Sequence, residues 1–500
     1  MKAIHHKTIH HGGKNTVTGS CHELQLGKNS LLIDCGLFQG QDLASRGNKA
    51  LDIDFPIKHI KALLLTHSHI DHIGRIPWLL AAGFKAPIYC TPATAELAPL
   101  MLEDTLKLQL NLDKGQRARI LERIRKQIKP IPYNQWYRIN LKLNLNEALL
   151  KNRNISSSSL KNQSTQLSSS RNRGTRCPRS TQSKHDPQYD YCYIRFQEAG
   201  HILGSAYIEI KLPNNQVIVF SGDLGPSNTP LLPDPKPPKR ADYLYLESTY
   251  GDKTHQDITT RRERLNHIIN KSLNNGGTII IPAFSVGRTQ ELLFDIEQLL
   301  HDQKLSHRLP IIVDSPLASK ITRSYRRYRK LWSAEAKNKV SNSRQPLKFS
   351  QCIVIEDHKQ HMGLVNRLAT SGEPAIVISA SGMCQGGRVV NYLKALLPDE
   401  RTDVIFAGYQ AHGTLGRTLQ NSAKHAVNSV DINGERIPLK AQVHTMYGYS
   451  AHADQSDLTK FVAGIGSQVS EIHLIHGDVE PKKTLKQLLV KQNPSTKVIT

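Results

Sequence analysis

The chain has 500 residues, of which 38% are hydrophobic, and its 66 lysines and arginines exceed its 42 aspartates and glutamates to give a net charge of +24. This length excludes a peptide or a small disulfide scaffold, and the charge predicts binding to polyanions, with nucleic acid favoured over an acidic membrane surface. The seven cysteines are scattered without a CxxC pair, and no stretch has the pattern of a signal peptide or a membrane span. We therefore expect a cytoplasmic protein with no membrane partner.

The first 140 residues predict short strands joined by tight loops, followed by helices. Apolar runs at 31–34 and 62–66 are typical of buried strands, and an apolar helix is expected at 77–82. Residues 103–130 are strongly basic and predict a single helical run that ends at a proline. The segment 141–190 is rich in serine and basic residues and poor in apolar ones, so we expect it to be a disordered insertion.

Strands return from Tyr191, and beyond Glu247 the pattern changes to repeated strand, loop and helix units. This alternation predicts a parallel sheet covered by helices. The last 60 residues return to short strands with two helices.

The segment THSHIDHIGR brings His67, His69, Asp71 and His72 together directly after the apolar strand ALLLT. In an extended segment, residues two apart face the same side, so His67 and His69 can bind one ion while the following turn presents Asp71 and His72 to another. Imidazole and carboxylate ligands without a thiolate favour zinc, with manganese or iron as alternatives.

Further ligand types follow other predicted strands. His201, Asp223 and His476 each come at or just after a strand end, and Asp34 has the same placement and could orient a metal-binding histidine. Taken singly, each of these residues could equally cap a turn. Together they indicate that an active site gathers ligands at one edge of a sheet.

The motifs DCG, THSHIDH, GHILGS and SGDLG resemble those of the metallo-β-lactamase superfamily, and ESTYGD, YSAHAD and LIHGD resemble three further motifs of its β-CASP branch. The resemblance covers nearly the whole chain outside residues 140 to 190. It implies an αββα sandwich with an inserted α/β domain of parallel-sheet type. The expected division is 1–250 for the first part of the lactamase-like domain, including the insertion, 251–440 for the β-CASP domain, and 441–500 for the second part.

The resemblance also implies two zinc ions per chain. One would be held by His67, His69 and His201 and the other by Asp71, His72 and His476, with Asp223 bridging both. It implies catalytic roles for Asp71, for His452 as the general acid, and for Glu247 as the group that holds His452. A histidine that is free of metal suits protonation of a leaving oxygen near neutral pH.

Three loops of the predicted parallel-sheet domain combine glycine or serine with an arginine near a helix start, where free backbone N–H groups favour anions. We expect RNA phosphate contacts from these loops. The residues concerned are Ser285, Arg288, Ser379, Ser381, Arg388 and Arg417.

The β-CASP branch processes nucleic acids, and the resemblance therefore implies a zinc-dependent endoribonuclease that hydrolyses single-stranded or locally unpaired RNA and leaves 5′-phosphate and 3′-hydroxyl ends. The alternatives are a 5′ to 3′ exoribonuclease of the same family, a small-molecule metallo-hydrolase and an inactive RNA-binding scaffold. The resemblance is also compatible with a homodimer.

Overall fold

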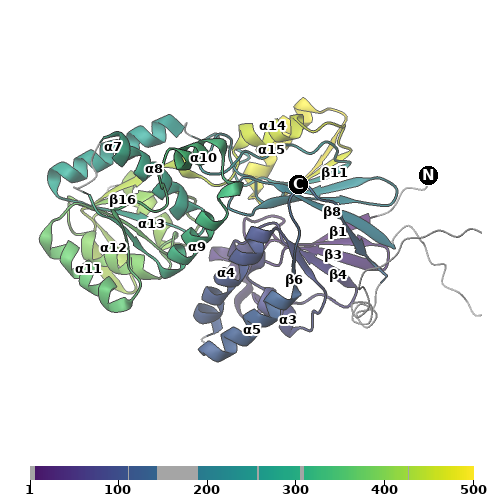
Figure 1. Cartoon of the computed structure of the whole chain (residues 1–500), viewed down its shortest axis with the longest axis horizontal. Helices are drawn as coiled ribbons and strands as arrows, with labels where there is room; N and C mark the ends of the chain where they lie inside the picture. The colour runs from purple at the N-terminus through teal and green to yellow at the C-terminus, as the bar shows by residue number, and fades with distance from the viewer. Residues whose placement is uncertain (1–5, 111, 143–189, 256–257, 304–308, 426) are drawn as a thin grey trace, which may run out of the picture.

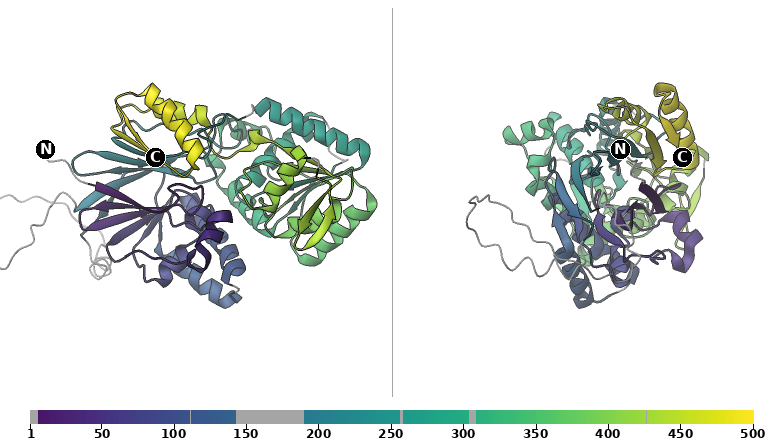
Figure 2. Two further views of the ribbon diagram at one scale, coloured as in Figure 1. Left: turned by 180° about the vertical axis from the view of Figure 1, so that it is seen from behind. Right: turned by 90° about the vertical axis from the view of Figure 1, so that its right-hand side faces the viewer.

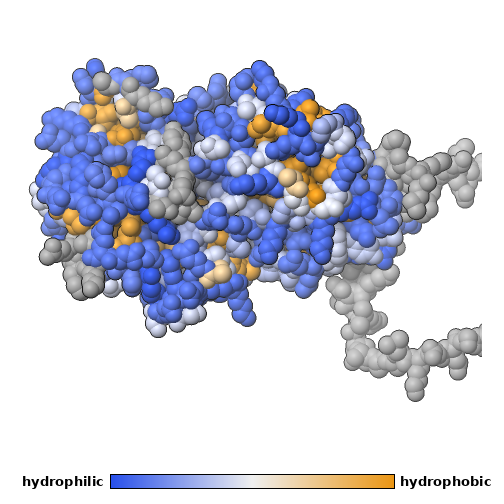
Figure 3. Space-filling view, turned by 90° about the horizontal axis from the view of Figure 1, so that it is seen from above, coloured by the Kyte–Doolittle hydropathy of each residue, from blue (hydrophilic) through white to orange (hydrophobic). Residues whose placement is uncertain are grey.

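The computed structural model describes residues 6–110, 112–142, 190–255, 258–303, 309–425 and 427–500. The chain forms two lobes that lie side by side along the long axis of the molecule (Figure 1). We call them the sandwich lobe, which holds two facing sheets, and the parallel-sheet lobe, which the chain builds within residues 258–449. Seen from above, the surface of both lobes is mostly hydrophilic (Figure 3).

The first sheet of the sandwich lobe has the order β1-β2-β3-β4-β5-β6, with β1 to β3 antiparallel and β3 to β6 parallel. Its strands are β1 (His6–Gly12), β2 (Cys21–Leu26), β3 (Asn29–Ile33), β4 (Ile60–Leu64), β5 (Ile88–Cys90) and β6 (Ile128–Pro130). The helices of this part are α1 (Gly40–Arg46), η1 (Gly47–Lys49), α2 (Ile70–Ile73), α3 (Ile76–Ala81), α4 (Pro92–Leu110) and α5 (Lys114–Gln127).

The second sheet has the order β21-β20-β11-β10-β9-β8-β7, parallel from β21 to β10 and antiparallel from β10 to β7. Its strands are β7 (Tyr137–Asn140), β8 (Tyr191–Glu198), β9 (Ala206–Lys211), β10 (Val217–Phe220), β11 (Tyr243–Glu247), β20 (Glu471–Ile475) and β21 (Lys497–Ile499). Helices α14 (Gln455–Ala463) and α15 (Val479–Gln492) accompany this sheet.

Alternating side chains explain why these layers stack. On β10, Ile218 and Phe220 join the core between the two sheets, whereas Val217 and Val219 join the core beneath α14 and α15. The first sheet also buries both faces, with Leu64 facing the second sheet and Leu63 facing the helices. Since each sheet is apolar on both faces, each needs one sheet partner and one layer of helices. The expected αββα sandwich is confirmed.

The parallel-sheet lobe holds a sheet of order β14-β13-β15-β12-β16-β19 in which every neighbouring pair is parallel. The strands are β12 (Thr278–Pro282), β13 (Ile311–Asp314), β14 (Cys352–Val354), β15 (Ala375–Ser379), β16 (Asp403–Phe406) and β19 (Gln442–Thr445), and β17 (Ser429–Ile432) and β18 (Glu435–Pro438) form a separate ribbon. The helices are α7 (Ile258–Asn275), α8 (Arg288–Asp302), α9 (Pro316–Arg327), η3 (Arg329–Leu331), α10 (Ala334–Ser341), α11 (His358–Ser371), α12 (Arg388–Leu396), α13 (Leu415–His425) and η4 (Tyr447–Tyr449).

Helices cover both faces of this sheet, as the view from behind also shows (Figure 2). On β12, Ile279 and Ile281 pack with α7, α8 and α9, while Ile280 packs with α11 and α12. Continuous apolar strands are typical of a parallel sheet buried on both sides, and they explain why the sequence shows no polar alternation here. The expected inserted α/β domain is confirmed.

Some local expectations need correction or stay open. The basic run expected as one helix at 103–130 is divided between α4 and α5, because Asp113 caps the start of α5 through Gln116. The insertion at 141–190 lies almost wholly outside the described residues. The expected domain boundaries stay a prediction, and β19, the last strand of the parallel sheet, begins just after the second of them. Among the described helices, none is long and apolar enough to cross a membrane.

Candidate metal centre

The site lies where strand ends of the two facing sheets meet. Asp34 follows β3, His67 and His69 follow β4, and His476 follows β20. Asp34 and His476 have φ angles of 58° and 48°, a left-handed backbone that is rare for residues other than glycine and that clusters at functional sites. These turns direct polar side chains from distant segments toward one point.

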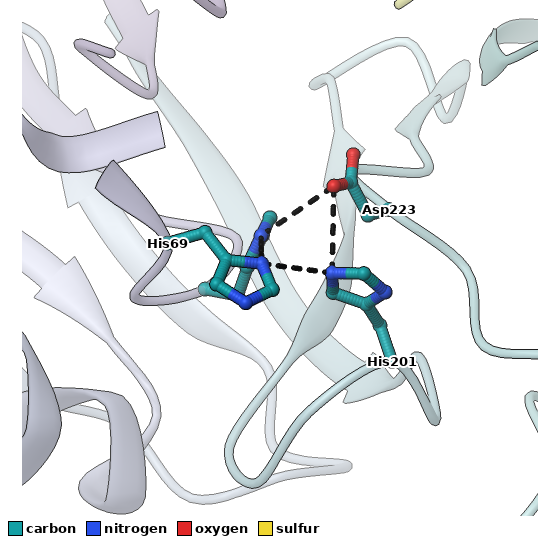
Figure 4. A group of neighbouring side chains, drawn as sticks. His69, His201 and Asp223 are labelled. Carbon is teal, nitrogen blue, oxygen red and sulfur yellow. Dashed lines mark hydrogen bonds and ion pairs between the residues drawn. The ribbon is translucent and has the colours of Figure 1, made fainter. Parts of the chain in front are cut away.

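A first group of four side chains can hold one ion: His67, His69, His201 and Asp223, whose ligand atoms all lie within 4.8 Å of one another. The Nδ1 atom of His69 lies 3.1 Å from Nε2 of His67 and 2.9 Å from Nε2 of His201. The Asp223 Oδ2 atom lies 3.5 Å from Nε2 of both His67 and His201. His69, His201 and Asp223 point toward one another from three separate segments (Figure 4).

A second group shares Asp223 with the first and contains Asp71, His72 and His476. Asp223 Oδ1 lies 3.3 Å from Nε2 of His72, and Asp71 Oδ2 lies 3.5 Å from Nε2 of His476. The two oxygens of Asp223 therefore face different groups. This arrangement suits a carboxylate that bridges two neighbouring ions.

The outer nitrogens of three histidines are already engaged, which fixes their tautomers. His72 Nδ1 donates to Asp34 at 2.7 Å, and His201 Nδ1 donates to the carbonyl of Ala451 at 2.7 Å. His67 Nδ1 donates to the Thr66 hydroxyl at 3.0 Å, because that hydroxyl itself donates to Asp34. Each Nε2 atom is then directed into the site, where it can bind a metal once it carries no proton.

The residues present fit a divalent metal. Asp223 is buried, and neither of its oxygens has a hydrogen-bond partner among the described residues. A buried carboxylate without such a partner is costly unless a cation balances it. Burial lowers the pKa of His69 to about 4, and burial also lowers the pKa values of His67 and His201. These imidazoles are therefore neutral at pH 7, the form that binds metal.

The second group carries the acidic partners. Burial acts to raise the pKa of Asp71, but the charge of His72 and the interactions with His476 together outweigh it and lower that pKa to about 2. Burial acts in turn to lower the pKa of His72, and Asp223, Asp34 and Asp71 together raise it above its ordinary value. Asp71 is therefore ionised at neutral pH and provides negative charge that a cation would balance.

His452 lies beside both groups without belonging to either of the shared ligand sets. Its ring is 4.6 Å from that of His201, and its Nδ1 donates to Glu247 Oε2 at 3.2 Å. Burial acts to lower its pKa, but the negative charges of Glu247, Asp223 and Asp71 together raise it to about 9. Glu247 ends β11, is buried, and also accepts a hydrogen bond from the backbone N–H of Leu224 at 2.6 Å. A buried carboxylate therefore holds the His452 imidazole in place and favours its protonated form.

A cavity of about 320 Å³ opens over these groups, between the two lobes. Its walls include His69, Asp71, Asp223, His452 and His476 from the sandwich lobe. The parallel-sheet lobe contributes the opposite wall, lined by Phe284, Ser285, Leu317, Ala380, Ser381, Gly382, Met383 and Tyr409. The histidines and carboxylates are concentrated on one wall, so a substrate in the cavity would meet the candidate metal ligands and His452 together.

The six residues expected to bind phosphate divide into two sets. Ser285 and Ser381 line the cavity. Arg288, Arg388 and Arg417 lie near helix starts as expected but do not line it, and the buried Ser379 donates its hydroxyl hydrogen to the carbonyl of Asp314.

Two of these arginines form ion pairs with neighbouring acidic residues. Arg388 donates to Asp314 at 2.6 Å and to the carbonyls of Ile355 and Glu356, and Arg288 pairs with Glu291. Both arginine charges are therefore already balanced inside the fold, and the expectation that they contact phosphate stays a prediction.

Several groups that shape the site escaped the analysis of the sequence. The Ala451 carbonyl orients His201, and the Thr249 hydroxyl lies 3.3 Å from Nδ1 of His476. A backbone carbonyl has no sequence signal. Thr66 and Thr249 stand within the motifs THSHIDH and ESTYGD, so their places in these motifs were the available signal.

Comparison with known proteins gives three family matches in chain order. Residues 16–138 match the metallo-beta-lactamase superfamily, residues 289–419 match the Beta-Casp domain, and residues 436–499 match the Zn-dependent metallo-hydrolase RNA specificity domain.

Similar proteins come from a bacterium and an archaeon. Ribonuclease TTHA0252 of Thermus thermophilus is 32% identical over 96% of this chain and 94% of its own length. An RNase J-like protein of Methanocaldococcus jannaschii is 30% identical over 94% of this chain and 91% of its own. The transcription termination factor FttA of the same archaeon is 28% identical over 96% of this chain and 69% of its own.

Proposed function

Because this chain belongs to the metallo-β-lactamase superfamily and to its β-CASP ribonuclease branch, we propose that it is an endoribonuclease that uses two metal ions. The observation that carries the proposal is the position of Asp223 between two groups of ligands, with His452 beside them. The first group would hold one ion through His67, His69 and His201. The second would hold the other through Asp71, His72 and His476.

The ligand chemistry supports zinc as the resident metal, since the groups contain imidazoles and carboxylates without thiolates. When bound, such ions lower the pKa of a water molecule and neutralise charge on the phosphate oxygens. Asp34, Thr66 and the Ala451 carbonyl would keep the ligand imidazoles oriented throughout the reaction.

RNA is the proposed substrate, in a single-stranded or locally unpaired form that can enter the cavity. The match to an RNA specificity domain covers His452 and His476, and a similar protein bears the name ribonuclease. The net charge of +24 favours a polyanionic substrate over a small neutral one.

In the proposed reaction, His452 acts as the general acid. Water attacks phosphorus in line with the bond to the 3′ oxygen, and that bond breaks. His452 gives its proton to the departing 3′ oxygen, while Glu247 holds the imidazole and stabilises its charged form. The products carry a 5′-phosphate and a 3′-hydroxyl.

A 5′ to 3′ exoribonuclease is the second candidate. The observation that favours it is the 30% identity to a protein named RNase J-like, which extends over 91% of that protein. Both activities use the same metal ligands, so only the products separate them.

We expect discrete internal fragments when a long RNA, labelled at its 5′ end in one sample and at its 3′ end in another, is incubated with zinc-loaded protein. The double variant Asp71→Ala, His72→Ala should leave the same RNA intact, because it removes two ligands of one proposed ion. Mononucleotides released from the 5′ end would instead support the exonuclease. Intact RNA with the native protein would contradict both activities.

The pH profile of cleavage should report the pairing of His452 with Glu247. A general acid must be protonated, so the rate should fall as the pH rises through the pKa of His452. Glu247→Gln removes the charge that raises this pKa but keeps an oxygen for the Leu224 N–H. The alkaline limb should therefore move to lower pH by about one unit or more. An unchanged limb in a variant that still binds metal would contradict the assignment.

A further inference from the structure

Outside the cavity, the end of α9 and the start of η3 form a groove lined by four arginines: Arg323, Arg326, Arg327 and Arg329. This arginine groove lies where the lobes meet, because α9 packs beside α4 of the sandwich lobe (Figure 1). The groove belongs neither to the proposed metal ligands nor to the loops expected to bind phosphate. Its residues have no role in the reaction described above.

The cations of α9 and η3 differ in whether an acidic residue lies beside them. Those directed at α4 meet acids: Arg327 donates to Glu96 at 2.7 Å, and Lys320 lies 3.9 Å from Glu103. By contrast, among the described residues no carboxylate lies within ion-pair distance of Arg323, Arg326 or Arg329. Three like charges in one groove repel one another unless an anion from outside neutralises them.

Two of these side chains are held against the protein. The Nε atoms of Arg326 and Arg329 are shielded from solvent and have no hydrogen-bond partner among the described residues. Arg329 also lies over the ring of the buried Trp332, at 6.0 Å from its centroid. Arginines fixed in this way lose less freedom when they bind a ligand, and the planar guanidinium fits a phosphate with two parallel hydrogen bonds.

The same helix connects the groove with the proposed active site. Leu317, in the first turn of α9, lines the cavity, and so do Met101 and Asp104 of α4. At 1.5 Å per residue, Arg323 lies about 9 Å along the helix from Leu317, and Arg326 lies about 14 Å along it. Along the helix axis the arginines of α9 therefore lie about two to three turns from the cavity wall, a separation that a few nucleotides can span.

We propose that the arginine groove binds the phosphate backbone of the RNA strand that extends out of the cavity. The phosphates bound there would lie several nucleotides from the scissile bond. This inference rests on the proposed function, because it presumes an RNA in the cavity. Such a groove would bind long RNA substrates independently of their sequence, since phosphate contacts position a strand without reading its bases. Short RNAs that fill only the cavity would not reach the groove.

The test compares a triple variant, Arg323→Gln, Arg326→Gln and Arg329→Gln, with the native chain. Arg327 is left in place because it ties α9 to α4. The matched control is Lys7→Gln, Lys28→Gln and Lys58→Gln, which removes the same charge from exposed positions at the far ends of the strands that lead to the metal ligands. A second triple variant with lysine at the three arginine positions keeps the charge and tests the fold.

Binding is measured by fluorescence anisotropy with a labelled 20-nucleotide oligo(U), in the Asp71→Ala, His72→Ala background so that the RNA stays intact. The arginine-to-glutamine variant should bind about tenfold more weakly, and its slope of log K against log salt should be shallower by about 2, as expected for three lost phosphate contacts to a single strand. The control with Lys7, Lys28 and Lys58 replaced by glutamine should keep the native slope. The variant with lysine at the three arginine positions should keep it too. In the active enzyme, cleavage of a four-nucleotide RNA should be unchanged, whereas cleavage of the long RNA should fall about tenfold in kcat/KM.

The outcomes separate this proposal from the proposed function. If the native chain cleaves RNA and the arginine-to-glutamine variant matches it in binding and salt slope, the groove does not bind RNA and the proposal is wrong. A groove that bound an acidic protein instead would give this same result. If the lysine control weakens binding as much, net charge alone is responsible and the proposal fails. If the native chain neither binds nor cleaves RNA, the proposed function itself is wrong.

Discussion

Replacing Asp223 with alanine is expected to lower the rate of RNA hydrolysis by about 10³-fold or more, because metal-ion catalysis contributes several kcal/mol of transition-state stabilisation. Asp223 is the one residue shared by both four-membered ligand groups among the described residues, and its two oxygens face different groups. No other single replacement removes a ligand from both. The metal content of the purified variant, measured by mass spectrometry, should fall from two ions per chain to one or none.

An Asp223→Asn variant sharpens this test. Asparagine keeps the shape and one acceptor oxygen but turns an amide N–H₂ toward the other group, where a cation is disfavoured. We therefore expect one ion per chain. The matched control is Asp302→Ala, which removes an exposed carboxylate from α8 and should change neither metal content nor rate. An Asp223→Ala protein that folds and still holds two ions would contradict the bridging role.

Much of this centre could be predicted from the sequence because the ligand types stand at strand ends. Carboxyl ends of parallel strands meet at one edge of each sheet, and the two facing sheets bring these edges together. His67, Asp223 and His476 therefore converge although many residues separate them along the chain. Imidazole and carboxylate side chains are metal ligands by their chemical nature, so the residue types alone indicate a metal site. The same alternation of apolar residues that marks the strands also determines which layers stack, so the fold class could be predicted as well.

The charged residues of the parallel-sheet lobe were harder to interpret. The sequence identifies Arg388 as the first residue of a helix, but it does not reveal that Asp314, 74 positions earlier, faces the guanidinium. Similarly, the run SYRRYRK shows many cations without showing that Arg327 meets Glu96 while Arg326 meets no acid among the described residues. Whether a charge is balanced depends on long-range packing, which local sequence does not specify.

Replacing His452 with alanine is expected to lower kcat on RNA by about 10² to 10⁴-fold, the usual contribution of a positioned general acid. The imidazole lies in the cavity wall with 19% of its side chain exposed, and its Nδ1 is engaged by Glu247, so Nε2 is the atom left to give a proton to the leaving oxygen. Because His452 is not part of the two groups that share Asp223, the variant should keep its metal content. The matched control is His301→Ala, which removes an exposed histidine from α8.

The leaving group decides between an acid and a merely structural role. The 3′ oxygen of RNA is a poor leaving group that needs a proton, whereas p-nitrophenolate departs without one. On bis(p-nitrophenyl) phosphate, the His452→Ala variant should therefore lose far less activity than on RNA, and the alkaline limb of its pH profile on RNA should disappear. Equal losses on both substrates would show that His452 maintains the shape of the site instead of donating a proton. Since Glu247 would then have no acid to hold, Glu247→Gln should also leave the pH profile unchanged, and the two variants together identify which role is correct.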